Sequence, residues 1–317
     1  MNSVDPAWLG SVAAFTGDIR RLMIARFIHQ RLRRLAVTLY GRGIPSRLLD
    51  AILYPTYLFQ FLEVHNRLPV RPNRLFNDFL FKIKSGSELK HPLRRLVTDK
   101  ELGKIYIEKK LGRGVTPRTH MILRSAAAVD RDTPSVYPSV VKPTHCSGRI
   151  VIVRSASEYA AASPTIKNWL QEDYFLDDLE KNYVGLERKV IVEEYIDDSF
   201  VLEGSLHCLN GEPKVISLID RTTKSRQSFD VNAMPLGVSL HFPLQEFEPK
   251  SWEFLPQLLE SARILASEFD YVRVDFYTDT TRILFGELTH LPAGGTGKFY
   301  PANGEMKFSE AFFRSPH

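Results

Sequence analysis

The sequence predicts a mixed α+β protein, in which a mostly helical first third is followed by strands that pair in antiparallel hairpins. Before residue 70, apolar residues recur at the spacing of amphipathic helices. After residue 138, short β-branched and apolar runs alternate with polar turns, among them Asn210–Gly211, the strongest hairpin signal in the chain. The 317 residues, 44% of them hydrophobic, suffice for one large domain or two to three smaller ones.

The first helical segment, residues 18–43, is basic and amphipathic. It contains seven arginines between Arg20 and Arg42, which we expect on the polar part of its surface. The apolar stripe that we expect to be buried consists of Leu22, Ile24, Ala25, Ile28, Leu32 and Leu35. Two interpretations stay open for this helix. It either packs on the next helix with a solvated outer face, or it rests on an anionic membrane surface.

A second helix is predicted over residues 47–66, where Leu, Tyr and Phe are frequent, and we expect it to pack against the first. Pro69 and Pro72 then end the helical region. A third helix is predicted from Lys100 to Gly112, because glycine is the favoured residue just beyond a helix C-terminus.

Strands and one further helix complete the predicted order, each bounded by polar or glycine-containing turns. The segments are a strand–loop–strand at 139–155, a strand at 188–196, two strands at 202–220, a helix at 252–269 and a hairpin at 271–291 with its turn near Thr281.

Composition excludes several classes of protein. The net charge of +5 permits an anionic partner, but the chain lacks zinc-finger spacing, an RNA-recognition aromatic motif and a long lysine run, so we expect no nucleic-acid partner. Its two cysteines, Cys146 and Cys208, form no CxxC pair, which argues against structural zinc and disulfides. No apolar run is long enough to cross a bilayer, and no signal-peptide pattern is present. We therefore expect a cytoplasmic protein, which the membrane interpretation places at the inner face of the membrane.

The predicted final hairpin carries two acids where apolar residues would be easier to bury. Asp275 and Glu287 each alternate with apolar residues, and a turn near Thr281 places them opposite each other on one face. Two oxygen ligands without a neighbouring His or Cys suit Mg²⁺ or Mn²⁺ better than zinc. The alternative is a pair of partly exposed acids, one of them paired with Arg273.

A small polar loop follows Lys142. Thr144 and Ser147 offer hydroxyls, Gly148 lets the backbone approach a ligand, and Lys142 supplies a point charge for phosphate. The spacing is not that of a P-loop, and the alternative is a simple hairpin connection.

The strand at 188–196 ends in two adjacent acids, Glu193 and Glu194, beside apolar residues. If an adenine lies here, the backbone at Tyr195 and Ile196 is placed to read its edge, and an acid can accept from its amine or from a ribose hydroxyl. The alternative is a strand end that reaches solvent.

Taken in order, these segments resemble the ATP-grasp superfamily, and within it the TupA-like branch associated with bacterial teichuronopeptide and cell-surface polysaccharide biosynthesis. The resemblance covers roughly Phe76 to the C-terminus. It rests on the segments FNDFLFKIKSGSELKHPLRRLVTDKELGKIYI, KPTHCSGRIVIV, NWLQEDYF, VIVEEYI, LNGEPKVISLIDR, VRVDFY, FGELT and PAGGTGKF. It implies an ATP-grasp fold, in which two α+β lobes with antiparallel sheets grip ATP. The implied division is a helical basic region at 1–75, an N-terminal lobe at 76–195 and a C-terminal lobe with the metal site at 196–317.

The resemblance also implies roles for individual residues. Those implied for nucleotide binding are Lys100 and Lys142 at the phosphates, Ser147 and Gly148 in the closing loop, Glu193, Glu194, Tyr195 and Ile196 at the adenine hinge, and Glu203 near the ribose. Those implied for metal binding and catalysis are Asp275 and Glu287 as ligands of Mg²⁺ or Mn²⁺, Arg273 beside the transferring phosphoryl group, and Lys298 with the Gly294–Gly297 turn at the acceptor edge.

Three departures from the family pattern carry expectations of their own. Gly148 is followed by Arg149 rather than by a second glycine, which predicts a stiffer loop. Thr289 stands where many relatives have an asparagine metal ligand, which predicts a weaker hold on a second metal. The run Glu203–Ser205 replaces Asp-Tyr-Lys, which predicts the loss of a substrate contact.

The activity implied by the resemblance is that of an ATP-dependent carboxylate–amine ligase. A carboxylate attacks the γ-phosphorus of ATP, and an amine then displaces phosphate from the acyl phosphate. The expected substrates are small molecules or glycans, such as a uronic acid or an amino acid destined for a surface glycan. Two alternatives stay open: a kinase of a sugar or glycan on the same fold, and a non-catalytic nucleotide-binding protein of a polysaccharide assembly.

Overall fold

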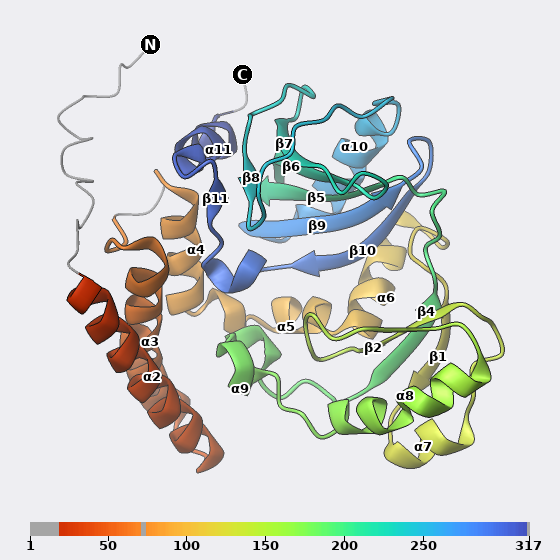
Figure 1. Cartoon of the computed structure of the whole chain (residues 1–317), viewed down its shortest axis with the longest axis horizontal. Helices are drawn as coiled ribbons and strands as arrows, with labels where there is room; N and C mark the ends of the chain where they lie inside the picture. The colour runs from red at the N-terminus through yellow and green to blue at the C-terminus, as the bar shows by residue number, and fades with distance from the viewer. Residues whose placement is uncertain (1–18, 71–73, 316–317) are drawn as a thin grey trace.

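The computed structural model describes residues 19–70 and 74–315, and within these ranges helices and three antiparallel sheets are combined (Figure 1). A four-stranded sheet and a five-stranded sheet form the two main bodies, and a pair of long helices lies beside them. The predicted α+β architecture with a helical N-terminal region is therefore confirmed. Within the described ranges, no helix combines the length and the apolar character needed to cross a membrane.

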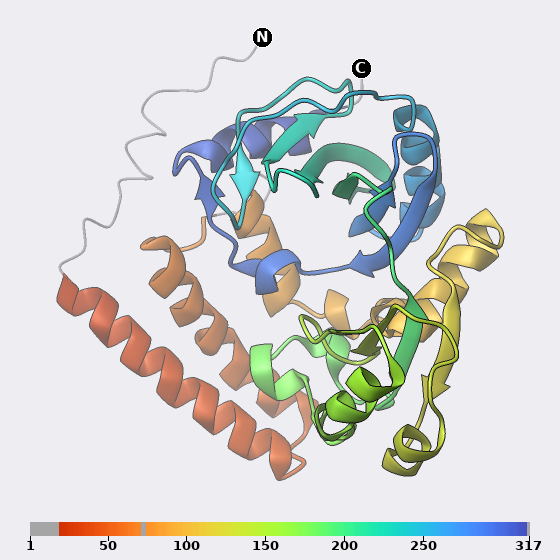
Figure 2. The same ribbon diagram turned by 45° about the vertical axis from the view of Figure 1, so that its right-hand side comes forward.

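The helical region consists of α2 (Ile19–Gly41) and α3 (Ser46–His65), which pack along each other at one side of the molecule (Figure 2). Both predicted helices, and their mutual packing, are confirmed. Pro55 lies inside α3 without ending it, and Pro72 falls outside the described residues.

The buried stripe of α2 differs from the predicted one. Ala25 and Ala36 are 2% and 0% exposed, whereas Ile24 and Leu35 are 58% and 46% exposed. The small alanine side chains let α2 approach α3 closely, so part of the larger apolar side chains faces away from the interface. The prediction was wrong for Ile24 and Leu35, and the side chain of Leu22 lies outside the described part.

The four-stranded sheet has the order β1-β4-β2-β3, with all neighbours antiparallel. Its predicted strand–loop–strand and its predicted strand at 188–196 are confirmed. Helices α7 and α8 bury a core of Leu, Val and Trp side chains against it. The bounds are β1 (Thr119–Leu123), α7 (Ala126–Arg131), β2 (Ser139–Pro143), β3 (Val151–Val153), α8 (Ala156–Trp169) and β4 (Val190–Glu194).

The five-stranded sheet has the order β10-β9-β5-β6-β7, again antiparallel throughout. Asn210 and Gly211, with φ of 52° and 81°, make the predicted tight turn between β5 and β6. The final hairpin and the helix before it are also confirmed. The bounds are β5 (Leu202–Leu209), β6 (Glu212–Asp220), β7 (Arg226–Asp230), α10 (Leu255–Ala266), β9 (Tyr271–Thr278) and β10 (Ile283–Thr289).

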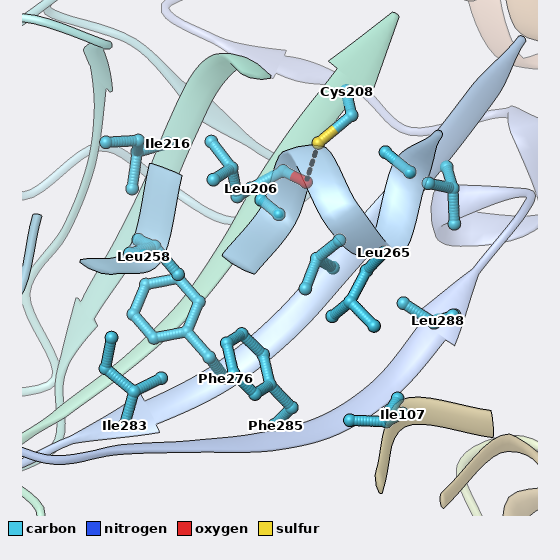
Figure 3. Packing of buried hydrophobic residues seen from close by; sticks show 14 of the residues in the cluster. Ile107, Leu206, Cys208, Ile216, Leu258, Leu265, Phe276, Ile283, Phe285 and Leu288 are labelled. Carbon is cyan, nitrogen blue, oxygen red and sulfur yellow. Dashed lines mark hydrogen bonds between the residues drawn. The ribbon is translucent and has the colours of Figure 1, made fainter. Parts of the chain in front are cut away.

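The two faces of this sheet differ in character. Phe276 of β9 packs in the main core with Leu206 and Leu258 (Figure 3). Val274 of the same strand belongs to this core as well. Residues of the other parity, beginning with Arg273, point to the opposite face. The hairpin therefore buries apolar residues on one side and presents charged ones on the other, as the alternation predicts.

A second core joins two helices that lie far apart in the sequence. Helix α4 (Phe76–Ser85) packs against α11 (Gly304–Phe313) and the edge of the five-stranded sheet. The N–H group of Phe76 donates to Ser309 Oγ at 2.9 Å, and that of Asn77 donates to Glu305 Oε1 at 2.9 Å. The free N–H groups at the start of α4 are thus capped by side chains from α11 rather than by its own flanking residues.

Shorter elements connect these parts. They are η1 (Glu88–Lys90), α5 (Pro92–Thr98), α6 (Lys100–Leu111), α9 (Phe175–Asp178), η2 (Lys181–Tyr183), β8 (Ser239–Leu240), η3 (Pro292–Gly295) and β11 (Phe299–Tyr300), where η denotes a 3₁₀ turn and β11 pairs with β8. Helix α6 with Gly112 as its C-cap confirms the third predicted helix. The segment from 195 to 201 links the two main sheets, and the division into lobes at this point stays a prediction.

A buried histidine beside these connections is held neutral. His290 is 1% exposed, and its Nδ1 lies 3.0 Å from Arg94 Nη1. Since a guanidinium can only donate, Nδ1 must accept, and the ring hydrogen sits on Nε2, 3.2 Å from the Arg94 carbonyl oxygen. Burial and the Arg94 charge hold the pKa of His290 well below its ordinary value.

We therefore expect the free energy of unfolding to fall as the pH drops below about 6.5, by ~1.4 kcal/mol per pH unit for this histidine. In that range the unfolded chain binds a proton that the folded ring does not, so the contribution is full above pH ~6.5 and is lost as the pH falls. His290→Gln offers the same donor and acceptor without titrating, and it is expected to flatten the slope in urea unfolding. An unchanged slope in the variant would contradict the assignment.

Candidate nucleotide and metal site

The two acids of the final hairpin lie directly opposite each other. Glu287 of β10 pairs with Asp275 of β9, and Thr289 pairs with Arg273. A bulge between Phe285 and Glu287 shifts the register by one residue, and this shift sets Glu287 level with Asp275. The predicted juxtaposition of the two carboxylates on one face is confirmed.

Contacts among these side chains form a compact charged cluster. Arg273 Nε and Nη2 donate to the two oxygens of Asp275 at 2.6 and 2.5 Å. Thr289 Oγ1 lies 3.0 Å from Asp275 Oδ2 and 3.3 Å from Glu287 Oε1, so it sits between the acids. Lys100 Nζ lies 3.3 Å from Glu287 Oε2. Three oxygen-bearing side chains and two cations thus meet at one end of the hairpin.

The neighbouring charges give the two carboxylates different pKa values. Lys100 contributes most to holding the pKa of Glu287 down at about 2, with Lys142 and Arg273 acting in the same direction against burial. Burial raises the pKa of Asp275, although Arg273 opposes the rise. Glu287 is therefore the carboxylate that stays anionic under all ordinary conditions.

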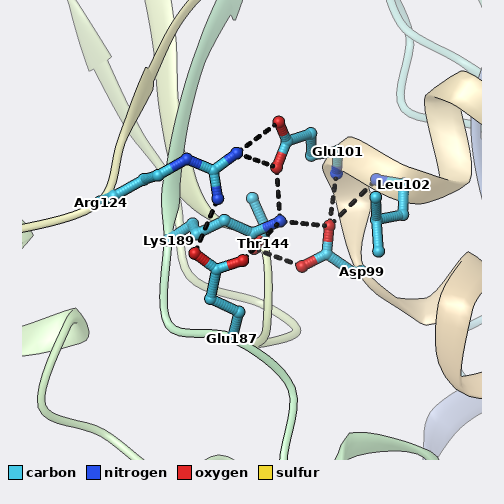
Figure 4. Close-up of polar contacts among 7 residues, drawn as sticks. All are labelled: Asp99, Glu101, Leu102, Arg124, Thr144, Glu187 and Lys189. Carbon is cyan, nitrogen blue, oxygen red and sulfur yellow. Dashed lines mark hydrogen bonds and ion pairs between the residues drawn. The ribbon is translucent and has the colours of Figure 1, made fainter.

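Lys100 is positioned by the start of α6. Asp99 caps this helix by accepting from the N–H groups of Glu101 and Leu102, both at 3.0 Å. Thr144 Oγ1 donates to the other oxygen of Asp99 at 2.8 Å, and Lys189 ion-pairs with Asp99 at 3.3 Å (Figure 4). The cap therefore ties Lys100 to the polar loop after β2 and to the residue that precedes β4.

Lys142 lies in β2 and is held by the neighbouring strand β4. It forms an ion pair with Glu193, whose second oxygen lies 3.0 Å from Lys104 Nζ. Burial alone would raise the pKa of Glu193, but Lys142 and Lys104 bring it below its ordinary value. Glu193, which is 4% exposed, thus orders a phosphate-binding candidate rather than reaching solvent. Lys104 was missed in the sequence because it reads as one more helical lysine.

The polar loop after Lys142 is tethered. Gly148 has φ of 69°, a left-handed conformation that favours glycine. The next residue, Arg149, donates to Glu172 at 3.0 Å and to Asp177 at 2.7 Å. These two ion pairs give the predicted stiffening a physical basis, because they anchor the loop to the segment around α9.

The linker between the sheets is also fixed. Arg221, another residue that the sequence did not single out, donates to the carbonyl oxygens of Ile196 at 2.9 Å, Asp197 at 2.7 Å and Phe200 at 2.8 Å. Glu194 Oε2 accepts from the N–H group of Arg118 at 3.1 Å. The hinge candidate therefore has an ordered backbone whose outer carbonyl at Ile196 is already used.

The departure at Glu203–Ser205 follows from packing. A Cβ on Gly204 would lie 2.3 Å from Phe276 Cζ and 2.7 Å from Leu218 Cδ2, so the sheet leaves no room for a side chain there. Glu203 faces the opposite side, where burial and the nearby Asp275 raise its pKa. Gly204 belongs to the core, whereas Glu203 belongs to the site.

One cavity of about 390 Å³ collects the predicted residues. Every residue implied for nucleotide, phosphoryl transfer and metal lines it: Lys100, Lys142, Ser147, Gly148, Glu193, Glu194, Tyr195, Ile196, Glu203, Arg273, Asp275 and Glu287. Lys298 does not line this cavity; its side chain is exposed, and its carbonyl oxygen accepts from the N–H group of His241. The roles of all these residues in binding and catalysis stay proposals.

Two further cavities open into the same place. One of about 330 Å³ shares Lys100, Ser147, Arg273 and Glu287 with the nucleotide cavity. Another of about 240 Å³ shares Glu203 and Arg273 with it. Arg273 lines all three cavities, so the described side chains leave space for three molecules or groups to meet beside it.

The residues present fit a hard divalent cation. Within the described ranges, no group of three or more His, Cys, Asp or Glu side chains is arranged to hold a metal ion by itself. A pair of carboxylates facing a cavity lined by lysines is the arrangement expected for Mg²⁺, which completes its coordination with water and phosphate oxygens. Asp275 and Glu287 would hold it.

Comparison with known families agrees with this arrangement. Residues 82–312 match the family described as TupA-like ATPgrasp. The chain belongs to the TupA-like ATP-grasp family. The matched region of this ATP-grasp protein begins in α4 and ends in α11, so it includes both main sheets and the cavity between them, whereas α2 and α3 precede it.

Solved structures show distant likenesses to this ATP-grasp protein. D-alanine–D-alanine ligase from Bacillus anthracis, complexed with ATP, is 17% identical over 62% of this chain and 54% of that chain, with a TM-score of 0.39. An L-amino acid ligase from Bacillus licheniformis is 16% identical over 75% and 56%, with a TM-score of 0.44. The ATP-grasp ligase PsnB, complexed with a minimal precursor, is 14% identical over 64% and 55%, with a TM-score of 0.35. The chain thus spans a little over half the length of each, and a comparison with curated proteins gives no match.

Proposed function

We propose that this protein is an ATP-dependent ligase that joins a carboxylate to an amine. The observation that carries the proposal is the meeting of three cavities at Arg273, one of them lined by the lysines and paired acids that suit a nucleotide and its metal. A ligase of this kind must bring ATP, a carboxylate and an amine together, whereas ATP hydrolysis alone needs one such space.

In the proposed reaction, a carboxylate oxygen attacks the γ-phosphorus of ATP, and the bond from that phosphorus to the bridging oxygen of ADP breaks. The amine, which binds as an ammonium group, first loses a proton. Its lone pair then attacks the acyl carbon, the bond to the phosphate oxygen breaks, and the nitrogen loses a second proton to give the amide. Lys100 and Lys142 neutralise phosphate charge, and Arg273 stabilises charge that develops at the junction of the cavities. A bound Mg²⁺ or Mn²⁺ would neutralise and orient the triphosphate oxygens.

The test is an ADP-release assay in which carboxylates and amines are offered separately and together. ADP and phosphate released in the presence of both, with an amide detected by mass spectrometry, is the expected result. Hydroxylamine added with the carboxylate alone is expected to give a hydroxamate, because it traps an acyl phosphate. A stable phosphorylated product that resists hydroxylamine would instead identify a sugar or glycan kinase. MgATP that raises the melting temperature without turnover on any acceptor would identify a non-catalytic nucleotide-binding protein.

The substrate class follows from the family resemblance. We propose a uronic acid, an amino acid or a glycan carboxylate that enters bacterial surface polysaccharide, handled in the cytoplasm where ATP is available. Nucleic acid is not among the proposed partners.

A membrane contact is proposed for the outer face of α2, defined by Met23, Ile24, Phe27 and Leu35, which are 46–66% exposed. Helix α2 contains arginines and no acidic residue, so its charge complements an anionic lipid surface. Phosphatidylserine vesicles are expected to bind the protein at low salt and to release it at high salt. Phe27→Glu is expected to abolish this binding, and equal binding to phosphatidylcholine vesicles would contradict the proposal.

A further inference from the structure

The cavity of about 330 Å³ beside Arg273 has an acidic wall that the nucleotide does not explain. Asp178 of α9 and Glu180 line it, together with the hydroxyl-bearing Tyr174 and Tyr183. The same cavity is also lined by Lys100, Arg273 and Glu287, which it shares with the nucleotide cavity. It therefore combines cations that suit phosphate with acids that suit a positively charged group.

Glu180 lacks a direct partner. It is 6% exposed, and no side chain or backbone group of the described residues donates a hydrogen bond or an ion pair to its carboxylate. The nearby Lys84 is engaged elsewhere, since its Nζ donates to Gln60 Oε1 at 2.9 Å and to the Gly294 carbonyl oxygen at 2.7 Å. A carboxylate taken out of water in this way costs several kcal/mol unless a cation or donors compensate it.

A second buried acceptor in this cavity also lacks a donor among the described residues. Asn182 is 2% exposed and lines the same cavity; its Nδ2 donates to Thr98 at 3.1 Å, while its Oδ1 has no hydrogen-bond partner in the described part of the chain. Burial raises the pKa of Glu180 to about 8, although Lys84 lowers it, so the charge of Lys84 offsets the burial of this carboxylate only in part. An N–H-rich cation would satisfy both Glu180 and Asn182.

We propose that this cavity binds the amine substrate as a primary ammonium group, with Glu180 and Asn182 as its acceptors. The inference rests on the proposed function and assigns one of the three cavities to one reactant. It also gives helix α3 a place in the site, because Gln60 lines the same cavity and accepts a hydrogen bond from Lys84.

The test measures binding rather than turnover, on the full chain without nucleotide. Ethylamine, ethanolamine and L-alanine amide serve as probes, with ethanol, ethylene glycol and L-lactamide as matched hydroxyl compounds, and saturation-transfer NMR reports contact. We expect the amines to bind and the hydroxyl compounds to give no signal. Glu180→Gln is expected to weaken the amines about ten- to hundredfold, as for the loss of a hydrogen bond to a charged group.

Control variants separate a local effect from unfolding. Glu260→Gln removes an exposed acid of α10 and is expected to leave amine binding unchanged. Asp178→Asn tests the exposed part of the acidic wall and is expected to weaken the amines less than Glu180→Gln does. All variants are expected to keep the thermal shift caused by MgATP, which reports an intact nucleotide cavity.

The outcomes distinguish this inference from the proposed function. Amine binding that depends on Glu180, without ADP release on any pair of substrates, would overturn the ligase and leave the amine site standing. Glu180→Gln that binds amines as tightly as the unchanged chain would overturn the amine site. Hydroxyl compounds that bind as well as amines would do the same.

Discussion

Replacing Glu287 with glutamine is expected to lower ATP turnover by about a hundred- to thousandfold while leaving the fold intact. Glutamine keeps the volume of the side chain and removes the charge that faces Lys100 at 3.3 Å. Under the proposed function, the same change removes one of two carboxylates that hold the divalent ion against the triphosphate. The loss is expected in the maximal rate rather than in stability.

Two measurements check this expectation. ADP release at saturating substrates gives the rate, and paramagnetic relaxation by Mn²⁺ in the presence of ADP reports the metal directly. Asp279→Asn is the matched control, since Asp279 lies in the turn of the same hairpin and pairs with Arg282 away from the cavity. Full turnover and unchanged Mn²⁺ binding in Glu287→Gln would remove the metal assignment.

Phe76→Ala is expected to lower the free energy of unfolding by about 3–5 kcal/mol, the range for deleting a buried phenylalanine. Phe76 is fully buried, and its ring lies 4.8 Å from Phe308, 4.9 Å from Phe312 and 5.3 Å from His207, measured between ring centroids. The alanine variant loses these contacts and leaves a cavity that rigid neighbours on a sheet and two helices cannot close.

Urea unfolding followed by circular dichroism measures this loss. Phe27→Ala is the control, because Phe27 is 58% exposed and its loss is expected to change stability by no more than about 0.5 kcal/mol. Phe76→Leu is expected to fall between the two. If Phe76→Ala were as stable as the control, the second core would not be the structural link described above.

Much of the fold was predictable because its signals are local. The Asn210–Gly211 turn, the glycine after α6 and the alternation along β9 each depend on a few neighbouring residues, and each is confirmed. The face of α2 was not predictable, because the choice between Ala36 and Leu35 as the buried residue depends on α3. The capping of α4 by Glu305 and Ser309 depends on a contact between segments more than 220 residues apart.

In the candidate site, too, some features follow from local signals and others depend on distant contacts. Asp275 and Glu287 were expected to face each other across one hairpin turn, and the structure reaches this pairing through the bulge between Phe285 and Glu287. The family resemblance adds the lysines around them. Glu180 carried no comparable signal, since the acidic run from Asp177 to Glu180 reads as a solvated turn. Only the packing of that segment against Gly294, where a Cβ would lie 3.8 Å from Glu180 Oε1, brings it into a cavity. Lys298 lines none of the three cavities that meet at Arg273, and its role at the acceptor edge stays a prediction.

The contact between α4 and α11 has a consequence for how the protein is made. Phe76 is synthesised more than 200 residues before its partners Phe308 and Phe312. At ~5–20 residues per second, an apolar surface of α4 waits for on the order of ten seconds or more before it is covered. During synthesis this core therefore stays open until Phe308 and Phe312 have been made, and the apolar surface of α4 is exposed to other molecules for that time.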